Sequence, residues 1–168
     1  MRENIRLTLE VLPLVVRVRW ALWREPFPAF YAAWNKGVEG EFHEAQEVSS
    51  STEGEPDADT RRIVWECAHA VSRAARLVPR ASCLTQALTL QRVLARRGQA
   101  CSLLLGVDRR APSSSGAPMR SKKGVEAHAW IEWHGRVLIG GDISRWTPFP
   151  LSTPSRVSQP SETAREAS

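Results

Sequence analysis

The segment from Cys83 to Arg97 carries the signals of a helix at both of its ends. Ser82 precedes it and is a good N-cap, because its hydroxyl can accept a hydrogen bond from a free N–H of the first turn. Gly98 follows it and can adopt the left-handed conformation that ends many helices. Apolar side chains recur along one face between these limits, at Leu84, Ala87, Leu88 and Leu94. We therefore predict a helix over residues 83–97.

Three strand patterns follow this helix. Residues 100–107 are almost continuously apolar, which is typical of a short buried strand. Residues 125–133 alternate, as in a strand whose two faces differ in chemistry. The dipeptide His134-Gly135 favours a tight hairpin turn, so residues 136–139 are predicted to pair with the strand before it. The polar residues 109–124 are expected to form a loop.

The first 46 residues are expected to form a helical region. Residues 5–23 are apolar nearly all round, and Pro13 is expected to kink this segment or to begin a new helix. Arg6, Glu10, Arg17 and Arg19 interrupt the apolar run, which is unlike the ~20 apolar residues of a membrane span. We therefore interpret the segment as a packed or interfacial helix. A further short helix is expected from about residue 30, before Gly37 and Gly40.

A polar linker is expected next, over residues 47–59, because this stretch is rich in serine and glutamate. Thr60 or Asp59 is expected to cap a helix that runs to Leu77. The main domain is predicted to span residues 60–150. Beyond Trp146 the prolines and hydroxyl side chains indicate a loss of regular structure, with residues 151–168 as a disordered tail. The pattern as a whole predicts an α+β fold, with helices packed on a small antiparallel sheet.

Charge and cysteine content limit the possible functions. The net charge of +5 comes mostly from arginines scattered through apolar segments, which suits an acidic peptide partner. Nucleic-acid binding is the weakest alternative, because no recognisable motif or aromatic-interleaved stripe is present. Three cysteines and no recognisable signal segment indicate reduced thiols in a cytoplasm. Neither zinc-type spacings nor a phosphate-binding loop is present, so no metal or other cofactor is expected.

Cys83 and His128 are the candidate catalytic pair. Cys83 opens a predicted helix, where the positive end of the helix dipole favours a thiolate. His128 lies on the predicted strand 125–133 and, beside that thiolate, could act as its base and then protonate a departing amine. The backbone N–H of Cys83 is free within its own helix and could help to hold an oxyanion.

A third group is needed to fix the tautomer of the imidazole. With a tight turn at His134-Gly135, the positions that face His128 fall between Gly140 and Asp142, and Asp142 is the only carboxylate there. A shift of one residue would turn Asp142 to the other face. The alternatives are Asp108, Glu126 and Glu132. Trp130 shares the face of His128, and it could be a core residue or a substrate-binding roof that limits water access.

Each of these residues has a plainer explanation when taken alone. A cysteine in a helix is more often a small buried hydrophobe than a nucleophile, and this reading is preferred for Cys67 and Cys101. A single histidine is more often structural. Only the ordered set of a helix-start cysteine, a strand histidine and a strand aspartate favours catalysis.

Several separated motifs occur together in a specific order. These are LVPRASCLTQAL at 77–88, LARRG at 94–98, LGV at 105–107, AHAWIE at 127–132 and GRVL at 135–138. In these motifs the chain resembles the transglutaminase-like cysteine proteases of lasso-peptide biosynthesis, over about residues 60–150. The loop at 109–124 is long and polar for that family.

The resemblance implies a papain-like, transglutaminase-type fold and a leader peptidase. Such an enzyme cuts the precursor peptide at the leader–core junction, and a separate ATP-dependent lasso cyclase then closes the macrolactam. The catalytic residues carry over to Cys83, His128 and Asp142. Residues 1–60 show no strand alternation, so the leader-recognition protein is expected to be separate. The alternatives are a transglutaminase-like acyl transferase and a non-catalytic peptide-binding scaffold that uses the basic surface and the seven tryptophans.

Overall fold

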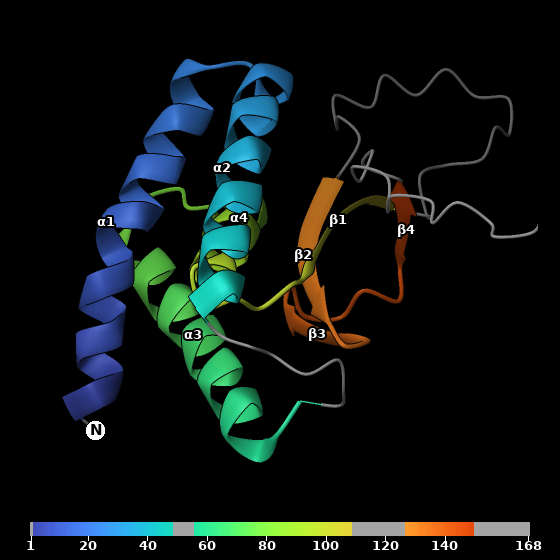
Figure 1. Ribbon diagram of the computed structural model, residues 1–168. Helices are drawn as coiled ribbons and strands as arrows, with labels where there is room; N and C mark the ends of the chain where they lie inside the picture. Colours follow the sequence, from blue (N-terminus) through green and yellow to red (C-terminus); the bar gives the residue numbers. More distant parts are fainter. Residues whose placement is uncertain (1, 49–55, 109–126, 150–168) are drawn as a thin grey trace, which may run out of the picture.

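The computed structural model describes residues 2–48, 56–108 and 127–149. Within these ranges four helices precede four strands, and the helices lie on one side of the sheet (Figure 1). The helices are α1 (Arg2–Arg24), α2 (Phe27–Val48), α3 (Ala58–Leu77) and α4 (Cys83–Ala95). The strands are β1 (Ser102–Asp108), β2 (Ala127–Trp133), β3 (Arg136–Ile139) and β4 (Trp146–Phe149). This arrangement confirms the predicted α+β fold.

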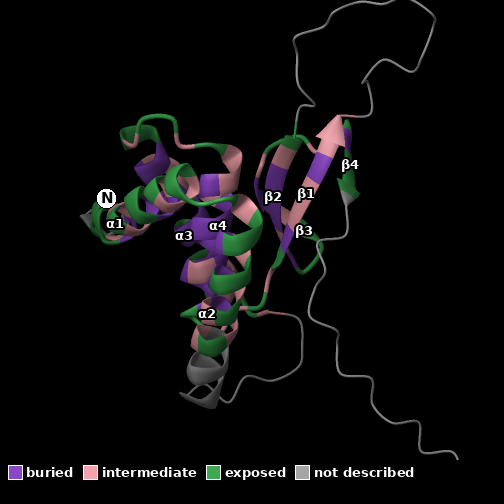
Figure 2. Cartoon of the chain, turned by 90° about the horizontal axis from the view of Figure 1, so that it is seen from above, coloured by how far each residue is buried: buried purple, intermediate pink, exposed green. Residues whose placement is uncertain are grey.

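The helix α4 lies at the centre of the fold. Nine of its 13 residues are buried, because it contacts the other three helices as well as β1 and β2. Figure 2 shows the buried residues concentrated along α3 and α4. The predicted cap is confirmed, since the Ser82 hydroxyl accepts a hydrogen bond from the Thr85 N–H at 3.3 Å. The helix ends at Ala95, and Gly98 follows with a φ of 66°.

The sheet is antiparallel throughout, with the strand order β3-β2-β1-β4. The predicted hairpin between β2 and β3 is confirmed. Its two turn residues, His134 and Gly135, have φ values of 46° and 71°, as a type I′ turn requires. The strand β4 was not expected, and the prediction that regular structure ends after Trp146 is wrong for residues 147–149. These residues pair with the otherwise free edge of β1.

The first helix packs one face onto the molecule. Val11, Val15 and Val18 are buried, and α1 contacts α3 and α4. The helix continues through Pro13, so this residue does not begin a new helix. In the described ranges no helix is long and apolar enough to cross a membrane.

The second helix is longer than expected, because it runs through Gly37 and Gly40 to Val48. A Cβ on Gly37 would lie 3.3 Å from the Arg92 guanidinium. That guanidinium is held by the Glu41 carboxylate, with N···O distances from 2.8 to 3.0 Å, and it lies over the Trp34 ring. Contacts from α4 therefore offset the low helix propensity of glycine at this point.

The third helix begins two or three residues earlier than predicted. Its N-cap is Asp57, not Thr60 or Asp59, and the Asp57 carboxylate accepts a hydrogen bond from the Thr60 N–H at 2.6 Å. That hydrogen bond lowers the pKa of Asp57. The polar linker is accordingly shorter than residues 47–59, since α2 reaches Val48 and α3 begins at Ala58. Residues 49–55, the whole loop at 109–124 and the tail at 151–168 lie outside the described residues.

Candidate active site

Cys83 is the first residue of α4 and lies half-buried against the apolar core. The Ser82 cap occupies one N–H of the first turn, while the N–H of Cys83 has no partner within the helix. Burial raises the pKa of the Cys67 thiol and raises that of Cys101 to about 12. Those two thiols stay protonated at neutral pH, which supports their interpretation as structural residues.

The chain path brings the start of α4 and the start of β2 to the same end of the sheet. Only residues 96–101 join α4 to β1, so the strand runs back along the helix (Figure 1). The 13-residue helix and the seven-residue strand have similar lengths, about 20 Å each. Because β2 is antiparallel to β1, with Gly106 opposite His128, the beginning of β2 lies beside the end of β1. Cys83 and His128 therefore belong to the same end of the molecule.

His128 is held by a hydrogen bond from its ring to the backbone. The Nε2 atom lies 2.6 Å from the carbonyl oxygen of Gly140. A carbonyl oxygen can only accept, so Nε2 carries the proton and Nδ1 is the unprotonated nitrogen of the neutral ring. The orienting acceptor is thus a backbone atom just after β3.

Two tryptophans form an aromatic wall beside His128. The Trp146 ring, on β4, stacks on the imidazole with the centroids 4.9 Å apart and the planes 23° apart. The Trp130 centroid lies 6.2 Å from that of His128. Trp130 is only 1% exposed, and its Nε1 donates to the Glu132 carboxylate at 3.1 Å. A ring so buried offers almost no surface to a substrate in this structure. The role of Trp130 in limiting water access stays a prediction.

Two glycines make room for the aromatic wall. A Cβ on Gly106 would lie 2.9 Å from the Trp130 ring and 2.8 Å from the carbonyl oxygen of Thr147. A Cβ on Gly140 would overlap the Cβ of Trp130, and Gly140 has a φ of 122°. Both positions therefore require glycine. Sequence reasoning missed Gly106 and Trp146, and it named Gly140 as a position that faces His128 without finding the role of its carbonyl. A glycine inside an apolar strand pattern is the signal that could have revealed the close approach at Gly106.

Asp142 lies close to the corner after β3 but does not bind the imidazole. Counting on from the pair Ile131–Ile139 would set Asp142 opposite His128, but β3 ends at Ile139. The carboxylate is exposed and accepts a hydrogen bond from the Ser144 N–H at 2.9 Å, which lowers its pKa. A catalytic role for Asp142 stays a prediction. Of the alternatives, Glu132 binds Trp130, and Glu126 lies outside the described residues.

The two candidate side chains have separate surroundings. Ala129, Ile131 and Trp133 of β2 belong to the core shared with the helices, so strand alternation turns His128 to the other face. Cys83, in contrast, packs against that shared core. Within the described ranges, no hydrogen bond joins the Cys83 thiol to the imidazole of His128.

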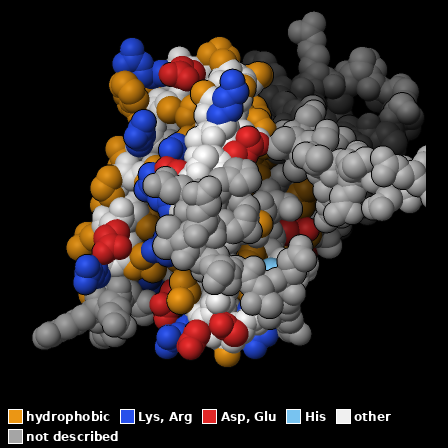
Figure 3. Space-filling model, in the orientation of Figure 1, with side chains coloured by type: hydrophobic (Ala, Val, Ile, Leu, Met, Phe, Trp, Pro, Cys, Tyr) orange, Lys and Arg blue, Asp and Glu red, His pale blue; other side chains and the backbone are white. Residues whose placement is uncertain are grey.

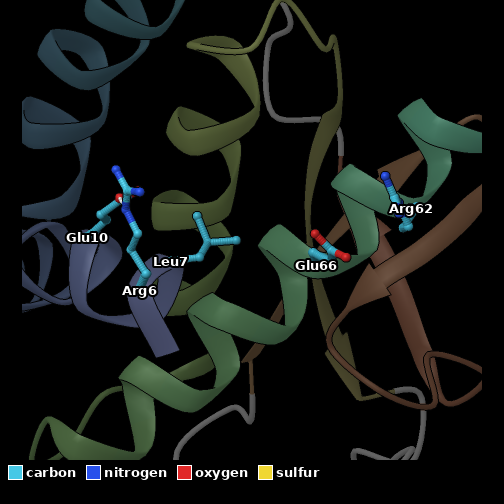
Figure 4. A pocket seen from close by; sticks show the side chains of 5 residues that line it. All are labelled: Arg6, Leu7, Glu10, Arg62 and Glu66. Atoms are coloured by element: carbon cyan, nitrogen blue, oxygen red, sulfur yellow. Dashed lines mark hydrogen bonds and ion pairs between the residues drawn. The ribbon is translucent and has the colours of Figure 1, made fainter. Parts of the chain in front are cut away.

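A hollow elsewhere contains none of these residues. It lies between α1 and α3 and is lined by Arg6, Leu7, Glu10, Arg62 and Glu66 (Figure 4). Arg6 is paired with Glu10 at 3.0 Å, and the lining charges balance. This hollow has no group placed for catalysis. Among the described residues, no cluster of three or more His, Cys, Asp or Glu side chains could hold a metal ion.

Comparison with known proteins identifies the fold family. A family model described as transglutaminase-like superfamily matches residues 29–150, from within α2 to just beyond β4. No curated protein and no solved structure matches the chain. Members of this superfamily generally have cysteine-peptidase or acyltransferase activity. The match covers well over half of the sequence and includes Cys83, His128, Gly140 and Asp142. The chain therefore belongs to the transglutaminase-like superfamily.

Proposed function

We propose that this protein is a cysteine peptidase that removes the leader from a ribosomally made lasso-peptide precursor. A separate cyclase then closes the macrolactam. Superfamily membership supports the class of chemistry, and the motifs at 77–88 and 127–132 support the substrate class. The observation that carries most weight is the Nε2 hydrogen bond of His128, because it leaves Nδ1 as a base at the end of the sheet where α4 begins.

In the proposed reaction the Cys83 thiol gives its proton to Nδ1 of His128, and its sulfur attacks the carbonyl carbon of the scissile bond. The oxyanion that forms is stabilised by the free N–H of Cys83. The imidazolium then protonates the departing amine as the C–N bond breaks, which leaves a thioester. Water attacks this thioester, His128 takes the proton of the water, and the thiolate leaves to be reprotonated.

This reaction requires Nδ1 to come within hydrogen-bond reach of the Cys83 sulfur. His128 and Cys83 have separate surroundings in this structure, so the imidazole must turn toward the start of α4 at the end of the sheet when the substrate binds. The stacked Trp146 and the Gly140 carbonyl define the resting position from which the imidazole moves. In the proposal Asp142 is a positioning residue, because its hydrogen bond to the Ser144 N–H holds the chain just after Gly140.

The proposed partners are the leader region of the precursor, a separate leader-recognition protein and the lasso cyclase, in a cytoplasmic setting. The net charge of +5 suits a peptide with acidic residues. Nucleic acid has no place in this scheme.

Cleavage of the precursor by the purified protein, with the recognition protein present, tests the proposal by mass spectrometry. We expect a free leader and a free core peptide from the native chain. Cys83→Ala should reduce the rate by at least about a thousandfold, since the nucleophile is removed. Cys101→Ala is the matched control, because it removes a thiol that burial keeps protonated.

Other outcomes would point to another function. A Cys83→Ala variant that cleaves as fast as the native chain would overturn the mechanism. An isopeptide-linked product would instead show acyl transfer, in which an amine takes the place of water. Precursor binding with no product from any variant would indicate a scaffold.

A further inference from the structure

The outer side of α1 carries a continuous row of exposed apolar side chains. Exposed fractions along this row range from 49% to 73%. Spacings of four, seven, four and three residues place the row on one side of the helix. Its members, called here the outer stripe, are Ile5, Leu9, Val16, Trp20 and Trp23. The row extends from Ile5 to Trp23, or about 27 Å along the helix axis.

This exposure is concentrated in α1. Among the described residues, five of the seven exposed large hydrophobic side chains belong to the outer stripe, and the other two are Ile63 and Leu77 of α3. The buried face of α1, with Val11, Val15 and Val18, is already occupied by the helical core. The superfamily match begins only at residue 29, so α1 lies outside it. The outer stripe is therefore not needed to complete the matched domain.

Arginines flank the outer stripe. Arg6, Arg17 and Arg24 follow one border at spacings of eleven and seven residues, and all are exposed. Arg6 is neutralised by Glu10, so the excess positive charge lies near the two tryptophans, where Glu25 is the nearby acid. The Arg24 guanidinium lies 4.6 Å above the Trp20 ring. Figure 3 shows hydrophobic and basic side chains, with acidic side chains in places between them, down the side of the molecule formed by α1.

We propose that the outer stripe docks α1 on the surface of an anionic membrane, with the helix lying in the plane of the interface. The apolar row would enter the boundary between headgroups and acyl chains, where tryptophan is favoured, and the arginines would contact lipid phosphates. A single convex helix offers a line of contact that suits a flat surface. The arginines of the border are complementary in charge to anionic headgroups, which an uncharged bilayer does not contain. This docking does not depend on the proposed peptidase activity.

Co-sedimentation of the full chain with vesicles tests this docking. We expect binding to phosphatidylcholine vesicles that contain about one third phosphatidylglycerol, and at least about tenfold weaker binding to phosphatidylcholine alone. High salt should weaken binding to the anionic vesicles, because the arginine contacts are screened. Equal binding to both vesicle types, or no binding to either, would overturn the proposal.

Two sets of variants identify the surface. The double change Trp20→Ser and Trp23→Ser should abolish binding, whereas Leu77→Ser, which alters a side chain that is 64% exposed on α3, should leave it intact. Arg17→Glu reverses one exposed border charge without touching the core, and it should weaken binding to anionic vesicles even if the double variant folds poorly. Melting temperatures monitor the fold. Loss of binding in Leu77→Ser, or native binding in Arg17→Glu, would contradict the assignment.

Other occupants would give different results. If sedimentation equilibrium without lipid shows a dimer in the native chain but not in the double variant, the outer stripe binds a second copy of the chain. If the native chain binds the recognition protein but not vesicles, and the double variant binds neither, the outer stripe is the binding surface for that protein. Either result would overturn membrane docking.

The cleavage assay separates this test from that of the peptidase. Precursor cleavage without vesicles should be equal in the native chain and the double variant.

Discussion

The start of α4 and the corner after β3 support the two halves of the proposed catalytic pair in different ways. The start of α4 is built locally, because the Ser82 cap binds the N–H of Thr85, only three residues along the chain. The corner is built from distant segments. His128 of β2 is held by Gly140 after β3 and by Trp146 of β4. Local signals therefore position Cys83, while tertiary packing positions His128.

This difference implies different sensitivities to mutation. A cap contributes about 1 kcal/mol, and its loss leaves the rest of a buried helix in place. A substitution in the corner after β3 should cost more stability, because Gly140 contacts both Trp130 and His128 and a change at one position displaces the others. Four substitutions test this difference, and their expected effects decrease from the first to the last.

Gly140→Ala should have the largest effect. The added Cβ overlaps the Cβ of Trp130, and a φ of 122° is strained for alanine. We expect a loss of roughly 2–4 kcal/mol in the free energy of unfolding, measured by urea titration. Gly141→Ala is the matched control, since its φ is 69° but nothing lies within 4 Å of its Cβ. That control should lose only about 1 kcal/mol, for the left-handed backbone alone. Equal losses would mean that Trp130 does not fix the corner.

Glu41→Gln tests a distant contact within the helical half. Burial raises the pKa of Glu41, but its hydrogen bonds and charge interactions with Arg92 and Arg96 outweigh burial, and the net shift is downward. We expect a loss of about 1–2 kcal/mol at neutral pH. A carboxyl with a lowered folded pKa stabilises the protein above the unfolded value of about 4.3 and loses this effect as the pH falls through the folded pKa. The difference between variant and native chain should therefore shrink in acid. A constant difference across the pH range would contradict a role for the Glu41 charge.

Ser82→Ala tests the local half. Removing the cap should cost about 1 kcal/mol in the free energy of unfolding, and Ser82→Asp should restore most of it. Thermal unfolding followed by circular dichroism measures both. A loss as large as that of Gly140→Ala would show that the start of α4 is not held locally, and the contrast between the two regions would fail.

Asp142→Asn should have the smallest effect, and it concerns the rate of cleavage. The amide oxygen of asparagine can still accept the hydrogen bond from the Ser144 N–H, so the rate should fall by only severalfold. Asp142→Ala, which removes the acceptor, should reduce the rate further. A loss in Asp142→Asn as large as that of Cys83→Ala would show that the carboxylate acts directly on the imidazole.

The same contrast explains which features the sequence could reveal. The α4 cap, the turn at His134-Gly135 and the strand alternation around His128 depend on neighbouring residues, and these predictions are confirmed. The length of α2 was missed, because Arg92 from another helix supports the chain at Gly37. The strand β4 was missed because its pairing partner, β1, lies about 40 residues earlier. Gly140 was recognised as a position near His128, but the acceptor proved to be its carbonyl, which no side-chain pattern encodes.

A backbone carbonyl has no proton to gain or lose in the range in which proteins are folded. The tautomer of His128 is therefore set by a group that acidification cannot disable, provided that the corner after β3 keeps its shape. A carboxylate in the same place would add a second ionisation to the acid side of the pH–rate profile. The carbonyl adds no ionisation of its own, so the steepness of that side of the profile would report which atom orients His128.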